Sequence, residues 1–207
     1  MDVSSLTLNR LSLYLRCLRS LQEQGVQRVS SQQLADQFDL SAPLIRKDLA
    51  RFGEFGIRGT GYDIEHLIDR LHSALGLDQQ HPLVVVGMGR LGTALARYLG
   101  FNDATFRVVA VLDNDPAMVG QEVGGLTVRH TEELQEIVRE HGVEIGVLTV
   151  PAEAAQPAYD ALVDAGVEAV LNFAPVRLQL RPGLPSKSVD FRIHLEELVY
   201  FLLSKED

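Results

Sequence analysis

The feature that most constrains the fold of this chain is a glycine motif that directly follows an apolar run. The run is Leu83-Val84-Val85-Val86, and the motif is Gly87-Met88-Gly89-Arg90-Leu91-Gly92. The apolar run predicts a buried strand, and the glycines have G-x-G-x-x-G spacing between that strand and a helix. Gly87 would make the tight turn, Gly89 would let a pyrophosphate approach the backbone, and Gly92 would let the helix pack closely. The motif therefore predicts a dinucleotide site in an α/β domain.

Asp113, at the end of a second apolar run (residues 108–112), favours a particular dinucleotide. It follows Gly92 by about twenty residues, where an acidic side chain accepts hydrogen bonds from the adenosine ribose. A carboxylate there also repels a 2′-phosphate, so NADH or NAD⁺ is favoured over NADPH or NADP⁺. The alternative is a glycine turn in an α/β domain that binds no nucleotide.

The second half of the chain alternates strands with helices. Apolar runs at residues 83–86, 108–112, 145–150 and 169–171 predict strands, and residues 91–99, 132–141 and 153–165 have helical spacing. Buried strands that alternate with helices form a parallel, doubly wound sheet. We therefore expect a Rossmann-type domain at residues 79–207, ending in an amphipathic helix at about residues 192–204.

Two further segments follow predicted strands. They are Thr149-Val150-Pro151 and Asn172-Phe173-Ala174-Pro175. Ligands of such sheets bind at the carboxyl ends of the strands, so both segments would line the crevice. Both are also compatible with plain strand-to-helix turns, because proline commonly begins a helix. Asn172 and Phe173 are the better candidates, since an amide and an aromatic ring suit a nicotinamide that carries a carboxamide.

Residues 1–78 have a different pattern, which predicts a winged-helix domain. The predicted helices are a leucine repeat that ends near Gly25, a short helix after Ser30, a third after Ser41 and a fourth at residues 64–75. Pro43 fits the first turn of the third helix. Four glycines within residues 53–62, with aromatic and β-branched residues between them, predict a tight hairpin as the wing.

The third helix of this domain carries a cluster of positive charge. Arg46, Lys47 and Arg51 point away from its apolar side, as in the recognition helix of a helix-turn-helix. Arg58, beside Gly59 near the wing tip, would reach phosphates or the minor groove. The alternative is a helical bundle with solvated surface charges. Because the chain has a net charge of −9, one basic surface would bind DNA in a defined orientation rather than coat it.

Composition excludes several classes of protein. No apolar run approaches the roughly 20 residues that cross a bilayer, and the first residues lack the order of a secretion signal. A single cysteine, Cys17, forms no internal disulfide and is expected to be a small buried hydrophobic residue. We expect a cytoplasmic protein without a membrane partner or a metal site.

Several of these segments together resemble the redox-sensing transcriptional repressor Rex. The resemblance rests on Arg46-Lys47-Asp48-Leu49, the wing at residues 55–62, the glycine motif at residues 86–92, Asn172-Phe173-Ala174-Pro175 and Val189-Asp190-Phe191, and it covers nearly the whole chain. It implies a repressor and not an enzyme. It also implies a homodimer that exchanges its C-terminal helices, and palindromic operator DNA that is bound without NADH and released with it.

The resemblance implies roles for individual residues. Arg46 and Lys47 would contact the operator, Arg58 would enter the minor groove, and Phe191 would lie by the nicotinamide pocket of the partner subunit. The expected DNA-binding residues are Ser41, Pro43, Arg46, Lys47, Arg51, Arg58 and Gly59. The expected residues around NADH or NAD⁺ are Gly87, Met88, Gly89, Arg90, Leu91, Gly92, Asp113, Asn114, Thr149, Val150, Pro151, Asn172, Phe173 and Phe191. The expected inter-subunit switch is Arg16, Tyr98 and Asp190.

An NAD-dependent oxidoreductase is the main alternative, because Rossmann domains most often serve enzymes. Such an enzyme needs a proton donor beside the nicotinamide. None of the three lysines, Lys47, Lys187 and Lys205, is placed for a catalytic Tyr-x-x-x-Lys pair, which leaves His130 and His141. A CoA-binding module of similar fold is a third interpretation, which explains the glycines but not the winged helix.

Overall fold

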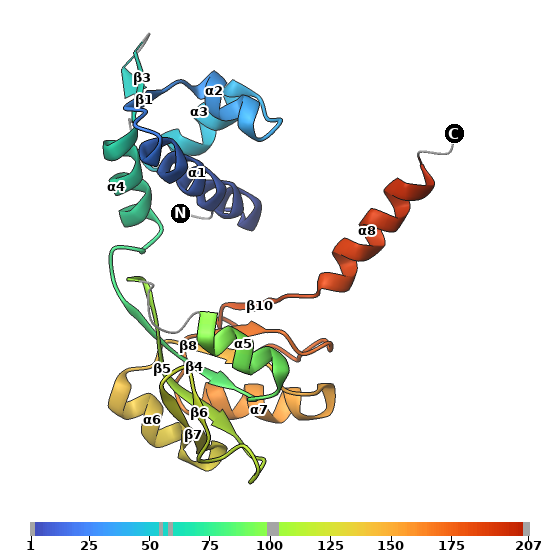
Figure 1. The fold of residues 1–207 in the computed structure, drawn as a ribbon. Helices are drawn as coiled ribbons and strands as arrows, with labels where there is room; N and C mark the ends of the chain where they lie inside the picture. Colours follow the sequence, from blue (N-terminus) through green and yellow to red (C-terminus); the bar gives the residue numbers. More distant parts are fainter. Residues whose placement is uncertain (1–2, 54–55, 58–59, 99–103, 205–207) are drawn as a thin grey trace. The chain divides into compact units, whose positions relative to one another are not determined.

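The computed structural model describes residues 3–53, 56–57, 60–98 and 104–204, with only the backbone of residues 56–57. The chain divides into two compact units, Met1–Gln79 and Gln80–Asp207, each described by itself (Figure 1). The boundary predicted after residue 78 lies one residue from this division. No helix of the described residues is long and apolar enough to cross a membrane.

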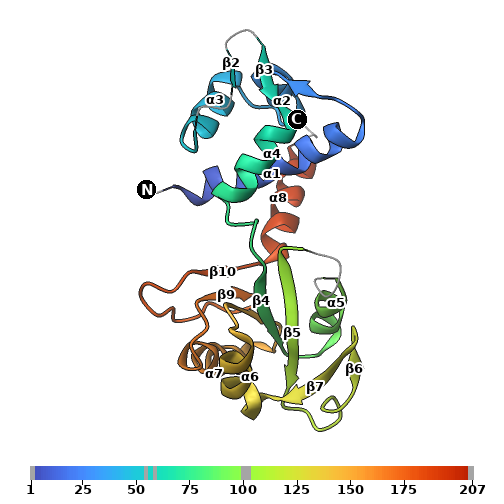
Figure 2. The ribbon, with the colours of Figure 1, turned by 90° about the vertical axis from the view of Figure 1, so that its left-hand side faces the viewer.

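The first unit contains helices around a small sheet (Figure 2). Its elements are α1 (Ser5–Glu23), β1 (Arg28–Val29), α2 (Ser31–Gln37), α3 (Ala42–Ala50), β2 (Gly56–Ile57), β3 (Gly61–Asp63) and α4 (Ile64–Ala74). The strands pair antiparallel in the order β1-β3-β2, so the predicted hairpin forms and β1 extends it. Four helices, a hairpin and one continuous core are the parts of a winged helix.

Local hydrogen bonds explain where these helices begin. Ser30 and Gln33 form a full capping box before α2, and the Asp63 side chain accepts a hydrogen bond from the His66 amide before α4. Ser41 occupies the N-cap position of α3, but its side chain makes no capping hydrogen bond. Cys17 is partly buried at the edge of the core, and this burial raises the pKa of its thiol, so the cysteine acts as a packing residue.

The second unit is a seven-stranded sheet with the order β10-β9-β8-β4-β5-β7-β6. All of its strand pairs are parallel except β6 with β7. The strands are β4 (His81–Val86), β5 (Phe106–Asp113), β6 (Glu122–Val123), β7 (Leu126–His130), β8 (Ile145–Leu148), β9 (Ala169–Asn172) and β10 (Ser186–Ser188). The helices are α5 (Arg90–Tyr98), η1 (Thr131–Glu133), α6 (Leu134–His141), α7 (Ala152–Asp164) and α8 (Phe191–Leu203).

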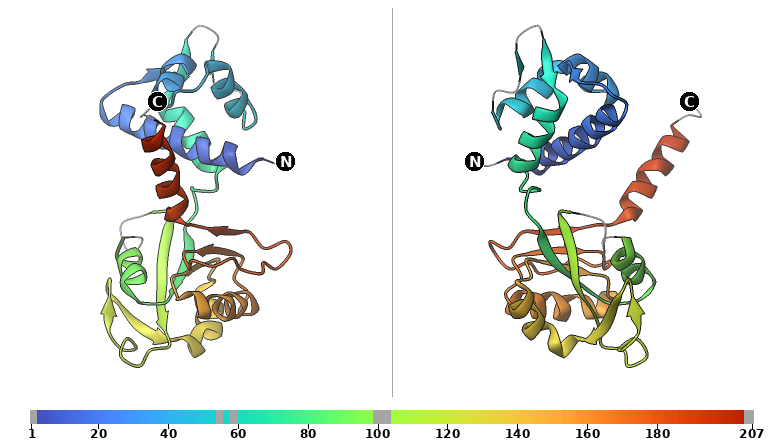
Figure 3. Two further views of the ribbon diagram at one scale, coloured as in Figure 1. Left: turned by 90° about the vertical axis from the view of Figure 1, so that its right-hand side faces the viewer. Right: turned by 60° about the vertical axis from the view of Figure 1, so that its left-hand side comes forward.

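Helices cover both faces of this sheet (Figure 3). The apolar core on one face includes Ala96 of α5, and the core on the other includes Ile137 of α6 and Leu162 of α7. The first strand, β4, lies between β5 and β8, so the chain reverses its direction of winding at β4. In such sheets a crevice opens at this switch point, outside the carboxyl ends of the strands.

The last helix, α8, packs differently from the others. None of its thirteen residues is buried, although many of them are apolar. Side chains such as Ile193, Leu198 and Phe201 are more than half exposed. Apolar helical residues in such number are normally buried against another element. This helix therefore presents an apolar surface that the rest of its own unit does not cover.

Candidate dinucleotide site and DNA-binding surface

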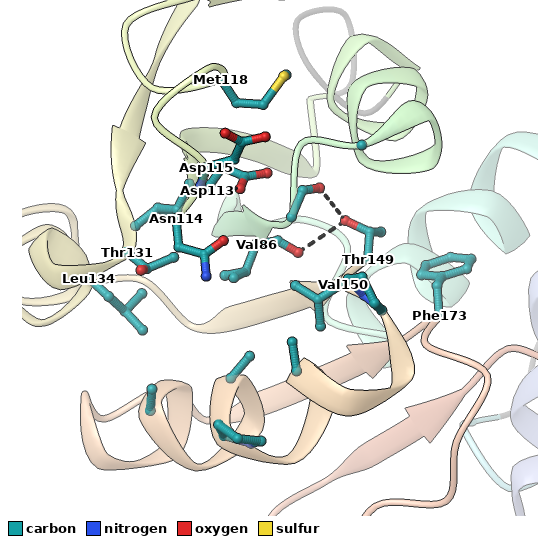
Figure 4. Close-up of a pocket in the computed structure, with 18 of the residues that line it drawn as sticks. Val86, Asp113, Asn114, Asp115, Met118, Thr131, Leu134, Thr149, Val150 and Phe173 are labelled. Carbon is teal, nitrogen blue, oxygen red and sulfur yellow. Dashed lines mark hydrogen bonds between the residues drawn. The ribbon is translucent and has the colours of Figure 1, made fainter.

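A cavity of about 960 Å³ opens where β4, β5 and β8 end (Figure 4). It is lined by Val86, Gly87, Gly89, Leu91, Leu112, Asp113, Asn114, Asp115, Met118, Thr131, Glu132, Leu134, Thr149, Val150, Pro151, Ala154, Pro157, Ala158, Ala161, Phe173 and Pro175. The volume lies within the range of small-molecule sites, roughly 300–1,000 Å³. The position is that expected for a nucleotide in a doubly wound sheet.

Packing requires two of the three motif glycines. Gly87 has a φ of +98°, and a Cβ atom there would lie 2.8 Å from Cγ1 of Val150. A Cβ atom on Gly92 would collide with the carbonyl oxygen of Gly87, because α5 packs directly on the turn. Gly87 and Gly92 thus make the turn and the close helix approach that the motif predicted.

The third motif glycine is not required by packing. A Cβ atom on Gly89 would meet no protein atom within 4 Å, yet Gly89 lines the cavity at the start of α5. A side chain there would fill space beside the first amides of the helix. Such amides carry the positive end of the helix dipole and bind phosphates. Because Gly89 has no side chain, the space beside these amides is open, and a ligand pyrophosphate could approach the backbone there.

Side chains at the carboxyl ends of β5 and β8, the two strands on either side of β4, hold the glycine turn in place. Asp113 accepts a hydrogen bond from the Met88 amide at 2.5 Å and another from the Asp115 amide at 2.9 Å. Thr149 donates its hydroxyl to the carbonyl oxygens of Gly87, at 2.6 Å, and Val86, at 3.0 Å (Figure 4). The turn is therefore ordered before a ligand arrives, which lowers the entropy cost of binding.

The charge of the lining restricts which nucleotide fits. The described lining residues include Asp113, Asp115 and Glu132 but no lysine, arginine or histidine. Among the described residues, each carboxylate oxygen of Asp113 accepts one hydrogen bond, which leaves a further lone pair on each for a ribose hydroxyl. An extra phosphate on the ribose would face carboxylates without a cation to pair with. The cavity thus favours a nucleotide without a ribose phosphate.

The opposite side of the cavity is apolar around Phe173. Val150, Pro151 and Pro175 also line it, which suits a flat neutral ring. Asn172 is placed otherwise than we expected. Its amide is buried, accepts from the Ala174 amide at 2.9 Å and donates to the carbonyl oxygens of Ala174 and Val176. Asn172 therefore shapes the loop that carries Phe173, and its amide group does not line the cavity.

Nine of the fourteen expected cofactor residues line the cavity: Gly87, Gly89, Leu91, Asp113, Asn114, Thr149, Val150, Pro151 and Phe173. Five do not. Met88 and Gly92 are buried, so Met88 could contact a ligand only through its backbone. Arg90 is exposed at the start of α5, and Phe191 is 67% exposed at the start of α8. Asn172 lies in the loop described above.

Sequence reasoning missed the side of the cavity formed by η1, α6 and α7. Thr131 and Glu132 follow β7, a strand that we did not predict, so their place at the sheet edge was not evident. Ala154, Ala158 and Ala161 of α7 also line the cavity. Their spacing of four and three residues places them on one side of a helix, and their small size leaves room there.

The structure exposes the cations of α3 on one side of the first unit. Arg46, Lys47 and Arg51 are exposed, and so are Ser41 and Pro43 at the start of the helix. Arg46 donates a hydrogen bond to the Ser31 hydroxyl of α2 at 2.9 Å. Arg58 and Gly59, expected at the wing tip, lie outside the described residues.

The expected switch residues are all exposed. Arg16 lies on α1 of the first unit, and Tyr98 lies at the end of α5 in the second unit. Asp190 is the N-cap of α8, where it accepts a hydrogen bond from the Arg192 amide at 2.9 Å. Exposure leaves these side chains accessible to a second copy of the chain.

The histidines that an oxidoreductase would need are placed outside the cavity. His130 caps η1 and has a carboxylate neighbour, with Nδ1 3.4 Å from an Oε2 oxygen of Glu132. His141 is exposed in the last turn of α6. Neither histidine lines the cavity.

Two protein families match separate parts of the chain. The family described as "Putative DNA-binding protein N-terminus" matches residues 2–50, and the family described as "CoA binding domain" matches residues 78–176. The first match covers α1 to α3, and the second covers β4 to β9 with the glycine motif.

Among curated proteins, a redox-sensing transcriptional repressor Rex of Streptomyces coelicolor is 46% identical over 194 residues, which cover 94% of this chain and 75% of the relative. Among solved structures, a Rex-family repressor named RSP is similar in two complexes. Its complex with β-NAD⁺ and operator DNA is 32% identical with a TM-score of 0.93, covering 100% of this chain and 95% of RSP. Its complex with β-NADH is 31% identical with a TM-score of 0.91, covering 100% and 97%.

Proposed function

This chain belongs to the Rex family of redox-sensing transcriptional repressors, and we propose that it binds operator DNA as a homodimer that NADH releases. One observation carries the proposal: a winged-helix unit with a cationic α3 is joined to a unit whose cavity fits a dinucleotide. The first would bind DNA, and the second would sense the ratio of NADH to NAD⁺. We infer that a protein that binds DNA and senses the ratio of NADH to NAD⁺ is located in the cytoplasm.

The cavity favours NAD(H) over CoA, although the second unit matches a family described as CoA-binding. CoA carries a phosphate on its adenosine ribose, and NAD(H) carries none. That phosphate would meet Asp113 and the neighbouring carboxylates. We infer that Asp113 binds the ribose hydroxyls, that Gly87 and Gly89 bind the pyrophosphate, and that Phe173 contacts the nicotinamide. The cofactor supplies the redox signal through the charge of its nicotinamide ring.

We infer that α3 is the recognition helix. Its outer side presents the exposed Lys47 and the C-cap Arg51, and Arg46 donates a hydrogen bond to Ser31. Such cations suit base edges and phosphates. Arg58 would extend this surface from the wing into the minor groove.

A homodimer would cover the apolar surfaces that one chain leaves exposed. The apolar α8 is one such surface. A second is a groove of about 490 Å³ on the α5 side of the sheet, lined by Leu83, Ile145, Val147 and Leu171 among others. Exposed apolar patches of this kind mark protein interfaces. We infer that a second copy of the chain supplies the cover, with each α8 packing on the partner.

The oxidoreductase alternative is not favoured. The relatives are transcriptional repressors, and the two histidines considered as proton donors, His130 and His141, are not among the described residues that line the cavity. A general acid must lie within hydrogen-bond reach of the reacting atom.

The proposal is tested by DNA binding at a fixed total concentration of NAD⁺ plus NADH. The reduced fraction is varied, and the affinity for a duplex that the protein enriches from a randomised pool is measured by gel shift. We expect affinity to fall as the reduced fraction rises. Enrichment of no sequence, or equal affinity at all reduced fractions, contradicts the proposal.

A further inference from the structure

A buried carboxylate lies at the edge of the inner side of α3. Asp48 is only 3% exposed, although Lys47, the residue before it, and Arg51, the C-cap residue of the helix, are exposed. Both of its oxygens are bonded. Arg10 of α1 donates Nε–H to Oδ2 at 2.6 Å and Nη2–H to Oδ1 at 2.8 Å, and the Tyr14 hydroxyl donates to Oδ2 at 3.0 Å.

The contacts continue to the first turn of α1. Arg10 also donates to the Thr7 hydroxyl at 3.2 Å, and the Thr7 amide donates to the N-cap hydroxyl of Ser4 at 3.3 Å. Thr7 and Tyr14 are buried with Asp48. A continuous polar network therefore joins the beginning of α1 to the last turn of α3.

Apolar packing constrains the rotation of α3 about its axis less sharply than a directional contact does. Ile45 and Leu49 bury the inner side of the helix, but hydrophobic contacts are not directional. A bidentate arginine–carboxylate pair is directional, because two parallel hydrogen bonds fix the carboxylate plane. Side chains one residue apart point about 100° apart on a helix, so fixing Asp48 also fixes the directions of Lys47 and Arg51.

The gain in stability does not by itself account for this cluster. A buried ion pair is often no more stabilising than apolar residues of similar volume, since both charges lose their hydration. The protonation states of Tyr14 and Asp48 nevertheless do not change near neutral pH. Burial and the hydrogen bond to Asp48 raise the pKa of Tyr14 to about 12. Burial tends to raise the pKa of Asp48, but hydrogen bonds from Arg10 and Tyr14 outweigh it and hold that pKa below its ordinary value.

We propose that Arg10, Tyr14 and Asp48 are positioning residues that fix the rotation of α3 and thereby set how well the protein distinguishes its operator from other DNA. The role rests on the DNA-binding function proposed above. Each side chain acts through α3 and touches no DNA itself. Loss of the cluster should therefore lower the preference for operator, while attraction to the phosphate backbone stays the same.

The test uses the full chain and two variants. Arg10→Met combined with Asp48→Leu replaces the ion pair by apolar side chains without changing net charge, and Tyr14→Phe removes one hydrogen bond. The matched control is Arg181→Met with Asp164→Leu, which removes an exposed ion pair of 2.9 Å at the end of α7. Each protein is titrated with the duplex that the wild type enriches from a randomised pool and with a scrambled duplex of equal composition.

We expect the ratio of scrambled to operator Kd to fall roughly tenfold in the double variant and about threefold in Tyr14→Phe, in line with hydrogen bonds to a charged group. Affinity for scrambled DNA, its salt dependence and NADH affinity should match the wild type. A purely structural role would change the melting temperature but leave the ratio unchanged. An unchanged ratio in either folded variant overturns the proposal. If the wild type enriches no duplex, the DNA-binding function itself fails.

Discussion

Asp113 has two roles in the structure. It lines the cavity, and it also bonds the Met88 and Asp115 amides that order the glycine turn. The motif spacing predicted the first role, because an acidic residue after the second strand meets the ribose. The second could not be read from the sequence, since it depends on how β4 and β5 are paired.

We predict that Asp113→Ala weakens NADH binding by about tenfold and reduces the discrimination against NADPH. The variant loses charge-assisted hydrogen bonds to the ribose and the repulsion of a 2′-phosphate. Titration of both cofactors, followed by NADH fluorescence and calorimetry, measures the effect. Glu140→Ala is the matched control, because it removes an exposed carboxylate of α6 that does not line the cavity. Identical titration curves for wild type and Asp113→Ala would show that Asp113 does not bind the ribose.

Asp48 gives a prediction about acid stability. Hydrogen bonds from Arg10 and Tyr14 hold its pKa below the ordinary value of 3.8, despite its burial. A carboxyl group with a lowered folded-state pKa stabilises the fold above its unfolded pKa and loses this contribution as the pH falls through the folded value. We expect the melting temperature of the wild type to drop below about pH 4 more steeply than that of Asp48→Asn. Asp69→Asn, an exposed carboxylate of α4, should keep the wild-type slope.

At the scale of elements, long periodic segments and short ones marked by glycines or a capping box could be predicted, whereas short strands without such a local signal could not. Helices α1, α4 and α7 and the strands β4 and β5 lie close to their predicted ranges, because periodicity and caps act locally. The strands β1, β6 and β10 have two or three residues each and exist only through their partners. The five residues of β7, Leu126–His130, include an arginine and a histidine, and pairing with β5 makes them a strand.

The element α3 contains both predictable and unpredictable parts of the DNA-binding surface. Its cationic side followed from helical spacing, whereas the burial of Asp48 did not, because a charge is buried only when distant partners are supplied. Those partners lie 34 and 38 residues earlier in the chain.

We predict that Lys47→Ala weakens operator binding by about 1–3 kcal/mol if the side chain contacts a base. Arg46→Ala should act similarly, and Arg58→Ala should act most on operators with a narrow A·T-rich groove. Gel shifts at constant salt measure these effects. Arg97→Ala, an exposed cation on α5, is the control for a general loss of charge. Wild-type affinity in all three variants would remove the assignment of the winged helix as the DNA-binding unit.

At the scale of the whole molecule, release from DNA requires the two cofactor forms to bind differently. NADH and NAD⁺ differ at the nicotinamide ring, which is neutral in NADH and cationic in NAD⁺. Burying the cation beside apolar groups such as Phe173 costs free energy that the neutral ring avoids. Only such a difference in affinity can shift a conformational equilibrium. A shift from 1:99 to 99:1 needs about 5.5 kcal/mol of preference between the two states, summed over the dimer.

The last prediction concerns how that preference reaches the DNA-binding units. Asp190 caps α8 through the Arg192 amide, and it is exposed where a second copy could meet it. If its charge pairs with Arg16 or Tyr98 across the dimer, Asp190→Ala should leave NADH affinity within about twofold and raise the NADH concentration needed for release roughly tenfold. Asp190→Asn separates this role from capping, because asparagine caps helices as well as aspartate but carries no charge. Both variants should blunt release in gel-shift titrations with NADH. Normal release by Asp190→Asn alone would mean that Asp190 serves only to cap α8. The coupling between NADH binding and DNA release would then depend on other residues.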